Sequence, residues 1–222
     1  MHWRTARSIH DRLFAAYGAQ GWWPADTPFE VIVGAVLTQN AAWKNVEYAL
    51  ENLRAAEALD PEAIRALSDE RLGELIRPSG YFNVKAQRLK AVCCHVLDAG
   101  GVEGLADKPT AALRQDLLAV NGVGRETADD IVLYAFHRPV FVIDAYTRRI
   151  FSRLGAIDGR EGYEELRGAF EKALGPKVEQ FQEYHGLIVR HAKEACGARP
   201  ACDRCCLRKR CPVGTGQADM PR

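Results

Sequence analysis

A group of four cysteines near the C-terminus constrains this chain more than any other feature. Cys196, Cys202, Cys205 and Cys211 form a C-x5-C-x2-C-x5-C run, so a stretch of 16 residues contains all four thiols. One metal centre can collect thiolates at this density without a large fold around it, and both zinc and iron–sulfur clusters take such ligands. The total of seven cysteines is odd, which argues against a secreted disulfide framework.

The charge of the chain is unevenly distributed. The net charge of the 222 residues is only +1, yet residues 185–212 contain seven Lys or Arg against two acidic residues. A surface that binds nucleic-acid phosphates needs such a local excess of positive charge.

The N-terminus has no apolar signal core and no apolar run is long enough to span a membrane. These features predict a reduced cytoplasmic setting, nucleoid-associated in a bacterium, with no membrane partner.

The hydrophobic pattern predicts an all-α fold. The apolar run 29–37 favours a buried helix over a strand, because Pro28 suits a first helical turn and no second strand-like run is present to pair with it. Asp60 and Thr110 are predicted helix N-caps, and residues 141–143 are predicted to be a short extended stretch. Further helices are expected at residues 85–97, 146–154, 163–174 and 178–195.

Residues 117–128 form the second informative motif. Asn121-Gly122-Val123-Gly124 joins two predicted helices, and Arg125 begins the second one. The glycines permit a tight turn and a close approach to another surface. The free N–H groups of the following helix would point outward there and suit a phosphate. A plain helical hairpin with a glycine turn accounts for the same residues.

The longer string, Leu-x-x-Val-x-Gly-Val-Gly-x-x-Thr-Ala, resembles the helix–hairpin–helix of the endonuclease III superfamily of DNA glycosylases. Three further segments are similar to that family, namely residues 34–40, 79–86 and 142–149. The resemblance implies a monomer that binds double-stranded DNA containing a damaged base. It implies that Gly122, Val123, Gly124 and Arg125 contact the DNA, that Gln39 fills the gap left by an extruded base, and that Asp144 is the catalytic aspartate. Asp144 also suits a helix N-cap.

The same resemblance implies that Cys196, Cys202, Cys205 and Cys211 hold a [4Fe–4S] cluster. The usual family spacing is C-x6-C-x2-C-x5-C, so this chain is one residue short in the first gap. Cys206 is taken as a non-ligand, and zinc remains the alternative. Arg199, between the first two cysteines, is expected to contact a DNA phosphate or to be an ordinary solvated arginine. Cys93 and Cys94 are expected to be small buried hydrophobic residues.

One position departs from the bifunctional members of the family. Those members place a lysine in the hairpin motif that attacks the sugar C1′ and then promotes strand cleavage, whereas this chain has Glu126 there. A carboxylate forms no imine, so AP lyase activity is doubtful unless another lysine, such as Lys85, takes that role. The remaining chemistry is hydrolytic, with Asp144 stabilising the sugar cation or activating water.

Residues 122–129 fit the form of the hairpin motif Gly-x-Gly-[KR]-Glu-[ST]-Ala-Asp. This form resembles that of the endonuclease III-like 3-methyladenine glycosylases. Trp22-Trp23-Pro24, the Leu-Thr-Gln-Asn turn at residues 37–40 and the His185-Gly186 pair add to this likeness. The resemblance implies that Trp23 and Trp43 line the base pocket, where an electron-rich indole suits a flat, positively charged purine. A place in the hydrophobic core is the alternative for either tryptophan.

The expected fold is therefore an all-α, two-lobed helix–hairpin–helix glycosylase with a C-terminal [4Fe–4S] loop. Residues 26–136 are predicted to form a helical barrel lobe, and residues 1–25 plus 137–222 the cluster lobe. The expected activity is monofunctional hydrolysis of the N-glycosidic bond of alkylated purines such as 3-methyladenine. Two alternatives stay open: a related glycosylase for oxidised pyrimidines, uracil or mismatched bases, with or without AP lyase activity, and a non-catalytic DNA-binding module.

Overall fold

The computed structural model describes residues 3–220, and within them all regular elements are helical. The prediction of an all-α fold is therefore confirmed. Residues 138–144, which include the predicted extended stretch, run as irregular backbone between two helices. The chain divides into two compact units, one formed by Ala25–Arg138 and the other by Met1–Pro24 together with Pro139–Arg222. None of the helices in the described part of the chain is long and apolar enough to cross a bilayer.

The unit Ala25–Arg138 is built around a buried helix, α2 (Pro28–Leu37), of which nine residues are buried. The Thr27 side chain caps α2 by accepting a hydrogen bond from Glu30 N (3.1 Å), and Pro28 occupies the first turn. The predicted choice of helix over strand is thus confirmed. The other elements of this unit are α3 (Trp43–Ala55), α4 (Pro61–Ala66), α5 (Asp69–Ile76), η1 (Arg77–Ser79), α6 (Phe82–Asp98), α7 (Gly101–Ala106), α8 (Thr110–Ala119), α9 (Arg125–Asp130) and the π-helical turn η2 (Ile131–Ala135). Among them, α3, α6, α9 and η2 pack against α2.

Two of the predicted helix starts in this unit have different outcomes. Asp60 caps α4 by accepting a hydrogen bond from Ala63 N (3.0 Å), as predicted. The prediction for Thr110 is wrong by one residue, since Pro109 is the N-cap and Thr110 is the first helical residue. The fixed φ of proline places Pro109 in the extended conformation that a cap position needs.

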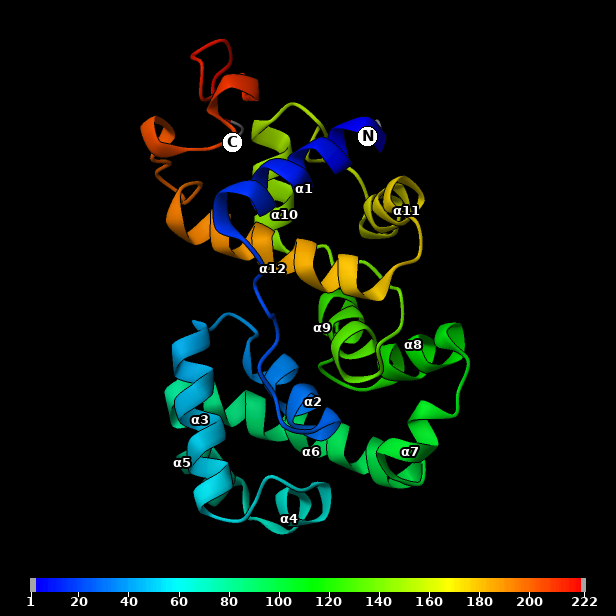
Figure 1. Cartoon of the computed structure of the whole chain (residues 1–222). Coiled ribbons are helices and arrows are strands. Elements are labelled where there is room, and N and C mark those ends of the chain that lie inside the picture. Colours follow the sequence, from blue (N-terminus) through cyan, green and yellow to red (C-terminus); the bar gives the residue numbers. More distant parts are fainter. Residues whose placement is uncertain (1–2, 221–222) are drawn as a thin grey trace. The chain divides into compact units, whose positions relative to one another are not determined.

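The other unit contains α1 (Trp3–Tyr17), α10 (Ala145–Arg153), α11 (Tyr163–Leu174), α12 (Val178–Glu194), η3 (Cys202–Arg204) and η4 (Arg208–Arg210). Its core is a cluster of buried rings in which Phe170 stacks on Phe141 with centroids 4.5 Å apart and Tyr184 packs edge-on against both. The Tyr184 hydroxyl donates a hydrogen bond to the carbonyl of Ala6 (2.7 Å), so α12 is tied to α1. In Figure 1, α12 lies beside α1 and α10, and it contacts both of these helices.

Candidate active site and cysteine centre

The helical hairpin predicted from the glycine motif is present between α8 and α9. Gly122 has φ +85°, a conformation that side-chain-bearing residues rarely adopt, and a Cβ atom added there would lie 2.2 Å from Cγ of Arg88. Both the backbone angle and the close approach therefore require glycine at this position. Gly124, Arg125 and Glu126 are exposed at the start of α9. The hairpin thus presents its second half to solvent.

Gln39, just beyond the end of α2, is bound to this hairpin through its side chain. Its Nε2 donates hydrogen bonds to the carbonyl of Gly122 (3.0 Å) and to Oγ1 of Thr127 (3.0 Å). Its Oε1 accepts a hydrogen bond from the guanidinium of Arg88. The structure therefore brings together Gln39 and the hairpin, two features that lie more than 80 residues apart in the sequence.

The side chain of Lys85 is buried in the interior of the unit Ala25–Arg138. Its side chain is 1% exposed, and Nζ donates hydrogen bonds to the carbonyls of Leu37 (2.8 Å) and Ser79 (2.7 Å). Burial, with a contribution from the charge of Arg88, lowers the pKa of Lys85 to about 8. The amine joins the C-terminal end of α2 to η1, which is a structural role and accounts for both contacts.

Tyr81 is a surface feature that the sequence analysis missed. It is 71% exposed, lies directly before α6 and has φ 49°, in the left-handed region. An exposed aromatic residue in an unfavourable backbone conformation is uncommon. The preceding Arg77-Pro78-Ser79-Gly80 break was the available signal, because such a turn delivers the next side chain to the surface.

Asp144 begins α10, and its carboxylate is almost completely buried. The side chain caps the helix: Oδ1 accepts hydrogen bonds from the backbone N–H of Thr147 (2.6 Å) and from its hydroxyl (2.7 Å). The N-cap interpretation of Asp144 is confirmed. The cap engages one oxygen only, and Oδ2 faces the ring of His185, whose Nε2 lies 3.5 Å away.

The surroundings of Asp144 favour the ionised carboxylate. Burial alone would raise the pKa of Asp144, but the neighbouring His185 and the hydrogen bonds from Thr147 together hold it below its ordinary value. His185 comes from α12 and is itself buried. No local sequence pattern indicates this contact, because the two residues lie 41 positions apart on different helices.

The two predicted pocket tryptophans are half-buried and are described within separate units. Trp23 lies in the segment that precedes Pro24, whereas Trp43 is the first residue of α3. The indole N–H of Trp43 donates a hydrogen bond to Glu47 (2.9 Å). Trp22 packs against α12, with its Cβ 2.8 Å from the position that a Cβ at Gly186 would take, and Nζ of Lys193 lies 5.6 Å from its ring centroid.

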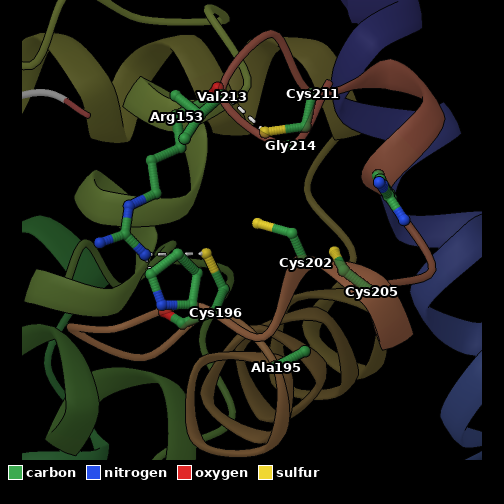
Figure 2. A pocket seen from close by; sticks show the side chains of 10 residues that line it. Arg153, Ala195, Cys196, Cys202, Cys205, Cys211, Val213 and Gly214 are labelled. Atoms are coloured by element: carbon green, nitrogen blue, oxygen red, sulfur yellow. Dashed lines mark hydrogen bonds between the residues drawn. The ribbon is translucent and has the colours of Figure 1, made fainter. Parts of the chain in front are cut away.

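The four C-terminal cysteines line one cavity at the end of α12, with about 290 Å³ of space between the atoms, part of it open to solvent. Figure 2 shows the sulfur atoms of Cys196, Cys202, Cys205 and Cys211 around this space. Within residues 3–220, no three His, Cys, Asp or Glu side chains lie close enough to hold a single metal ion.

Two arginines of α10 hold the first cysteine in place. The Arg153 guanidinium, which is buried, donates hydrogen bonds to Sγ of Cys196 (3.3 Å) and to the carbonyls of Gly197 (2.7 Å) and Ala198 (3.1 Å). Arg149 donates from Nε to the carbonyl of Cys196 (2.9 Å). The start of the cysteine loop is therefore anchored to α10 by these two side chains.

The remaining cysteines and Arg199 lie outside this cavity. Cys206 does not line it and instead contacts the hydroxyl of Tyr17. Cys93 is completely buried on α6, as expected, whereas Cys94 is only half-buried. Arg199 is exposed on the loop between the first two cysteines.

A glycine-turned helical hairpin, a buried N-cap aspartate and a C-terminal thiol centre define the class of helix–hairpin–helix DNA repair proteins. The comparison with family models agrees: residues 33–176 match the HhH-GPD superfamily, described as base excision DNA repair proteins. The chain belongs to this superfamily, which supports an enzyme that acts on DNA.

Individual relatives support the same assignment. A protein of Methanocaldococcus jannaschii, named provisionally as a DNA repair glycosylase, is 48% identical over 206 residues, covering 91% of this chain and 94% of the relative. Endonuclease III of Sulfolobus acidocaldarius is 30% identical over 186 residues, covering 82% of this chain and 81% of that protein. Among solved structures, the 3-methyladenine DNA glycosylase of H. pylori, bound to 1,N6-ethenoadenine, is 31% identical with a TM-score of 0.72, covering 86% of this chain and 95% of that one.

Proposed function

We propose that this protein is a monofunctional DNA glycosylase that removes alkylated purines such as 3-methyladenine from double-stranded DNA. The observation that carries the proposal is the absence of an available lysine at the hairpin: Glu126 occupies the position of the family nucleophile. The amine of Lys85 is buried and bound to two carbonyl groups. Neither Glu126 nor Lys85 therefore supplies an amine for an imine route to strand cleavage, and hydrolysis remains.

The proposed chemistry fits the surroundings of Asp144. An N3- or N7-alkylated purine carries a positive charge and leaves as a neutral base, so the electron pair of the C1′–N bond departs with it. The sugar becomes an oxocarbenium-like cation, which an ionised carboxylate stabilises. Water then adds to C1′, Asp144 assists in removing its proton, and an intact abasic site results. The depressed pKa of Asp144 keeps the required negative charge at neutral pH.

Two further features support an alkylpurine as substrate. Trp23 and Trp43 would offer indole faces to a cationic base, to which aromatic rings are attracted electrostatically. The H. pylori relative named as a 3-methyladenine glycosylase is 31% identical over most of the chain. Gly122, Val123, Gly124, Arg125, Gln39 and Arg199 are the proposed DNA contacts, and the enzyme would act as a monomer.

The four cavity-lining cysteines would bind a [4Fe–4S] cluster. The residues present fit such a group, because four thiols surround one space and the Arg153 guanidinium lies beside the Cys196 sulfur. When bound, the cluster would fix the loop of residues 196–211 to the end of α12 through its iron–thiolate bonds. Neither Cys206 nor the two cysteines of α6 would take part.

The test is release of free base by the purified protein. Duplexes carrying 3-methyladenine or 7-methylguanine should lose the modified base and retain an unbroken strand, and Asp144→Asn should be inactive on both. Duplexes with thymine glycol, uracil or a mismatch form the comparison set. Release from this second set alone would replace the alkylpurine proposal by the oxidised-pyrimidine alternative, which the 30% identity to an endonuclease III favours. DNA binding without release of any base would establish a non-catalytic module.

A further inference from the structure

We infer that His185 is a positioning residue for Asp144: through its contact with Oδ2 it fixes the direction and the negative charge of the carboxylate that faces the reacting sugar. The inference rests on the proposed function, in which Asp144 is the catalytic group. It assigns to α12 a part in the chemistry.

The two oxygens of Asp144 have different surroundings. Oδ1 is engaged by the backbone and hydroxyl of Thr147, at 2.6 and 2.7 Å, and so serves the helix cap. Oδ2 lies 3.5 Å from Nε2 of His185. Because the cap already uses Oδ1, Oδ2 is the oxygen available to the sugar cation or to water. His185 therefore contacts the oxygen on which the reaction depends.

His185 is held firmly at this place. The preceding residue, Tyr184, donates its hydroxyl to the carbonyl of Ala6 (2.7 Å) and is completely buried. The following residue, Gly186, lies so close to Trp22 that any side chain there would force a displacement. Neighbours on both sides thus fix the register of α12 and, with it, the position of the His185 backbone.

Other charged groups near the start of α10 are directed elsewhere. Arg148 donates a hydrogen bond to the carbonyl of Glu161 (2.9 Å), and Arg149 donates one to the carbonyl of Cys196 (2.9 Å). From α11, Tyr163 offers a neutral hydroxyl that accepts from Ile143 N at 3.4 Å. Since burial alone would favour the protonated acid, His185 and the Thr147 cap are what keep Asp144 ionised.

Three substitutions separate positioning from simple packing. His185→Gln places an N–H donor at about the reach of Nε2, His185→Asn places one a bond shorter, and His185→Leu fills the space without a donor. We expect single-turnover base release by the holoenzyme to fall about 10–100-fold in the Leu and Asn variants, by analogy with residues that orient the ligands of a metal. The Gln variant should recover most of the rate. The Kd for lesion-containing duplex should change little in all three.

A second measurement does not depend on any DNA activity. The ¹³Cγ signal of Asp144 reports its ionisation, and its titration midpoint should move upward in His185→Leu and His185→Asn relative to the wild type and His185→Gln. If the wild type releases no base from any duplex, the proposed function fails while this measurement still tests the contact. A full rate in His185→Leu, an unchanged Asp144 titration, or equal losses in the Gln and Asn variants would each overturn the inference. Should the Leu variant fail to fold, the Gln and Asn pair decides.

Discussion

The guanidinium of Arg153 lies 3.3 Å from the sulfur of Cys196 and also binds two carbonyls of the loop that follows it. One buried arginine thus orders the entry to the cysteine loop and places positive charge beside its first thiol. Hydrogen bonds to a charged group contribute roughly 1.5–3 kcal/mol each to stability, so this contact is a substantial part of what holds the loop.

Arg153→Met should therefore reduce cluster assembly and lower the thermal unfolding temperature. Methionine keeps similar length and apolar volume but removes every donor, which leaves the loop carbonyls and the Cys196 thiolate without their partner. Iron and acid-labile sulfide per chain, with the unfolding midpoint, measure the effect. Arg199→Met, on the exposed part of the same loop, is the matched control and should retain full iron content. Equal iron in both variants would contradict this role of Arg153.

The cysteine centre itself gives a prediction about composition. The purified protein should be yellow-brown, with about four iron atoms and four sulfide ions per chain. Cys196→Ser and Cys211→Ser should lose the colour, because each removes one of the thiols that line the cavity. Cys206→Ser should keep it, since Cys206 contacts Tyr17 outside the cavity. A colourless native protein with one zinc per chain would reject the cluster.

Asp144→Asn should abolish most base release while lesion DNA still binds. Asparagine keeps the shape and the helix-capping oxygen but removes the charge that stabilises the sugar cation, and loss of one such electrostatic group typically costs ~10²–10³-fold in rate. Single-turnover kinetics and a DNA-binding titration separate the two effects. Asp158→Asn, an exposed carboxylate in the same unit, is the control. Full activity in Asp144→Asn would assign catalysis to a different carboxylate.

The ionisation of Asp144 should make the free energy of unfolding depend on pH, and Asp144→Asn tests this. Because the folded-state pKa of Asp144 is depressed, its ionised form stabilises the folded protein above the unfolded-state pKa of about 3.9, and this contribution disappears as pH falls through the folded value. Denaturant unfolding should show Asp144→Asn less stable than the wild type from pH 5 to 7. The difference should shrink steadily below about pH 4. A constant difference across this range would show that the carboxylate charge is irrelevant to folding.

The wild-type protein should leave abasic sites intact and should not be trapped on DNA by borohydride, because its hairpin has Glu126 where the bifunctional relatives have a lysine. Glu126→Lys should introduce detectable trapping, and Glu126→Gln should not. The gain should be weak, since the new amine would be protonated at neutral pH and thus poorly nucleophilic. Gel analysis of borohydride-treated complexes measures it. Efficient trapping of the wild type would show that the protein is a lyase and would favour oxidised pyrimidines as substrates.

The sequence predicted the helical elements well where periodicity and caps agreed, as in α2 and α4. It did not predict the start of α6 at Phe82, because the helix begins after a left-handed residue, Tyr81, which no propensity favours. The π-helical turn after α9 was also missed, since its apolar residues have the same spacing pattern as an ordinary buried helix. Local sequence signals therefore failed where the backbone departs from regular geometry.

For the site, the sequence identified single residues but not their contacts. Asp144 was assigned both a cap and a catalytic role, and the structure confirms the cap. The approach of His185 to Asp144 and of Arg153 to Cys196 depends on how α10 and α12 pack, which neither motif encodes. Likewise, the hydrogen bonds from Lys85 to two carbonyls depend on its burial in the fold, which the position of a single lysine in the sequence does not indicate.

The unit that holds both Asp144 and the cysteines is assembled from the two ends of the chain, Met1–Pro24 and Pro139–Arg222. During synthesis, the contiguous unit Ala25–Arg138 emerges whole and is free to fold first, whereas α1 must wait for α11 and α12 before it can bury its apolar face. Tyr184 cannot reach the Ala6 carbonyl until the chain as far as that residue has left the ribosome. A nascent chain that stops before Tyr184 thus displays a folded hairpin but not the completed unit that holds Asp144 and the cysteines.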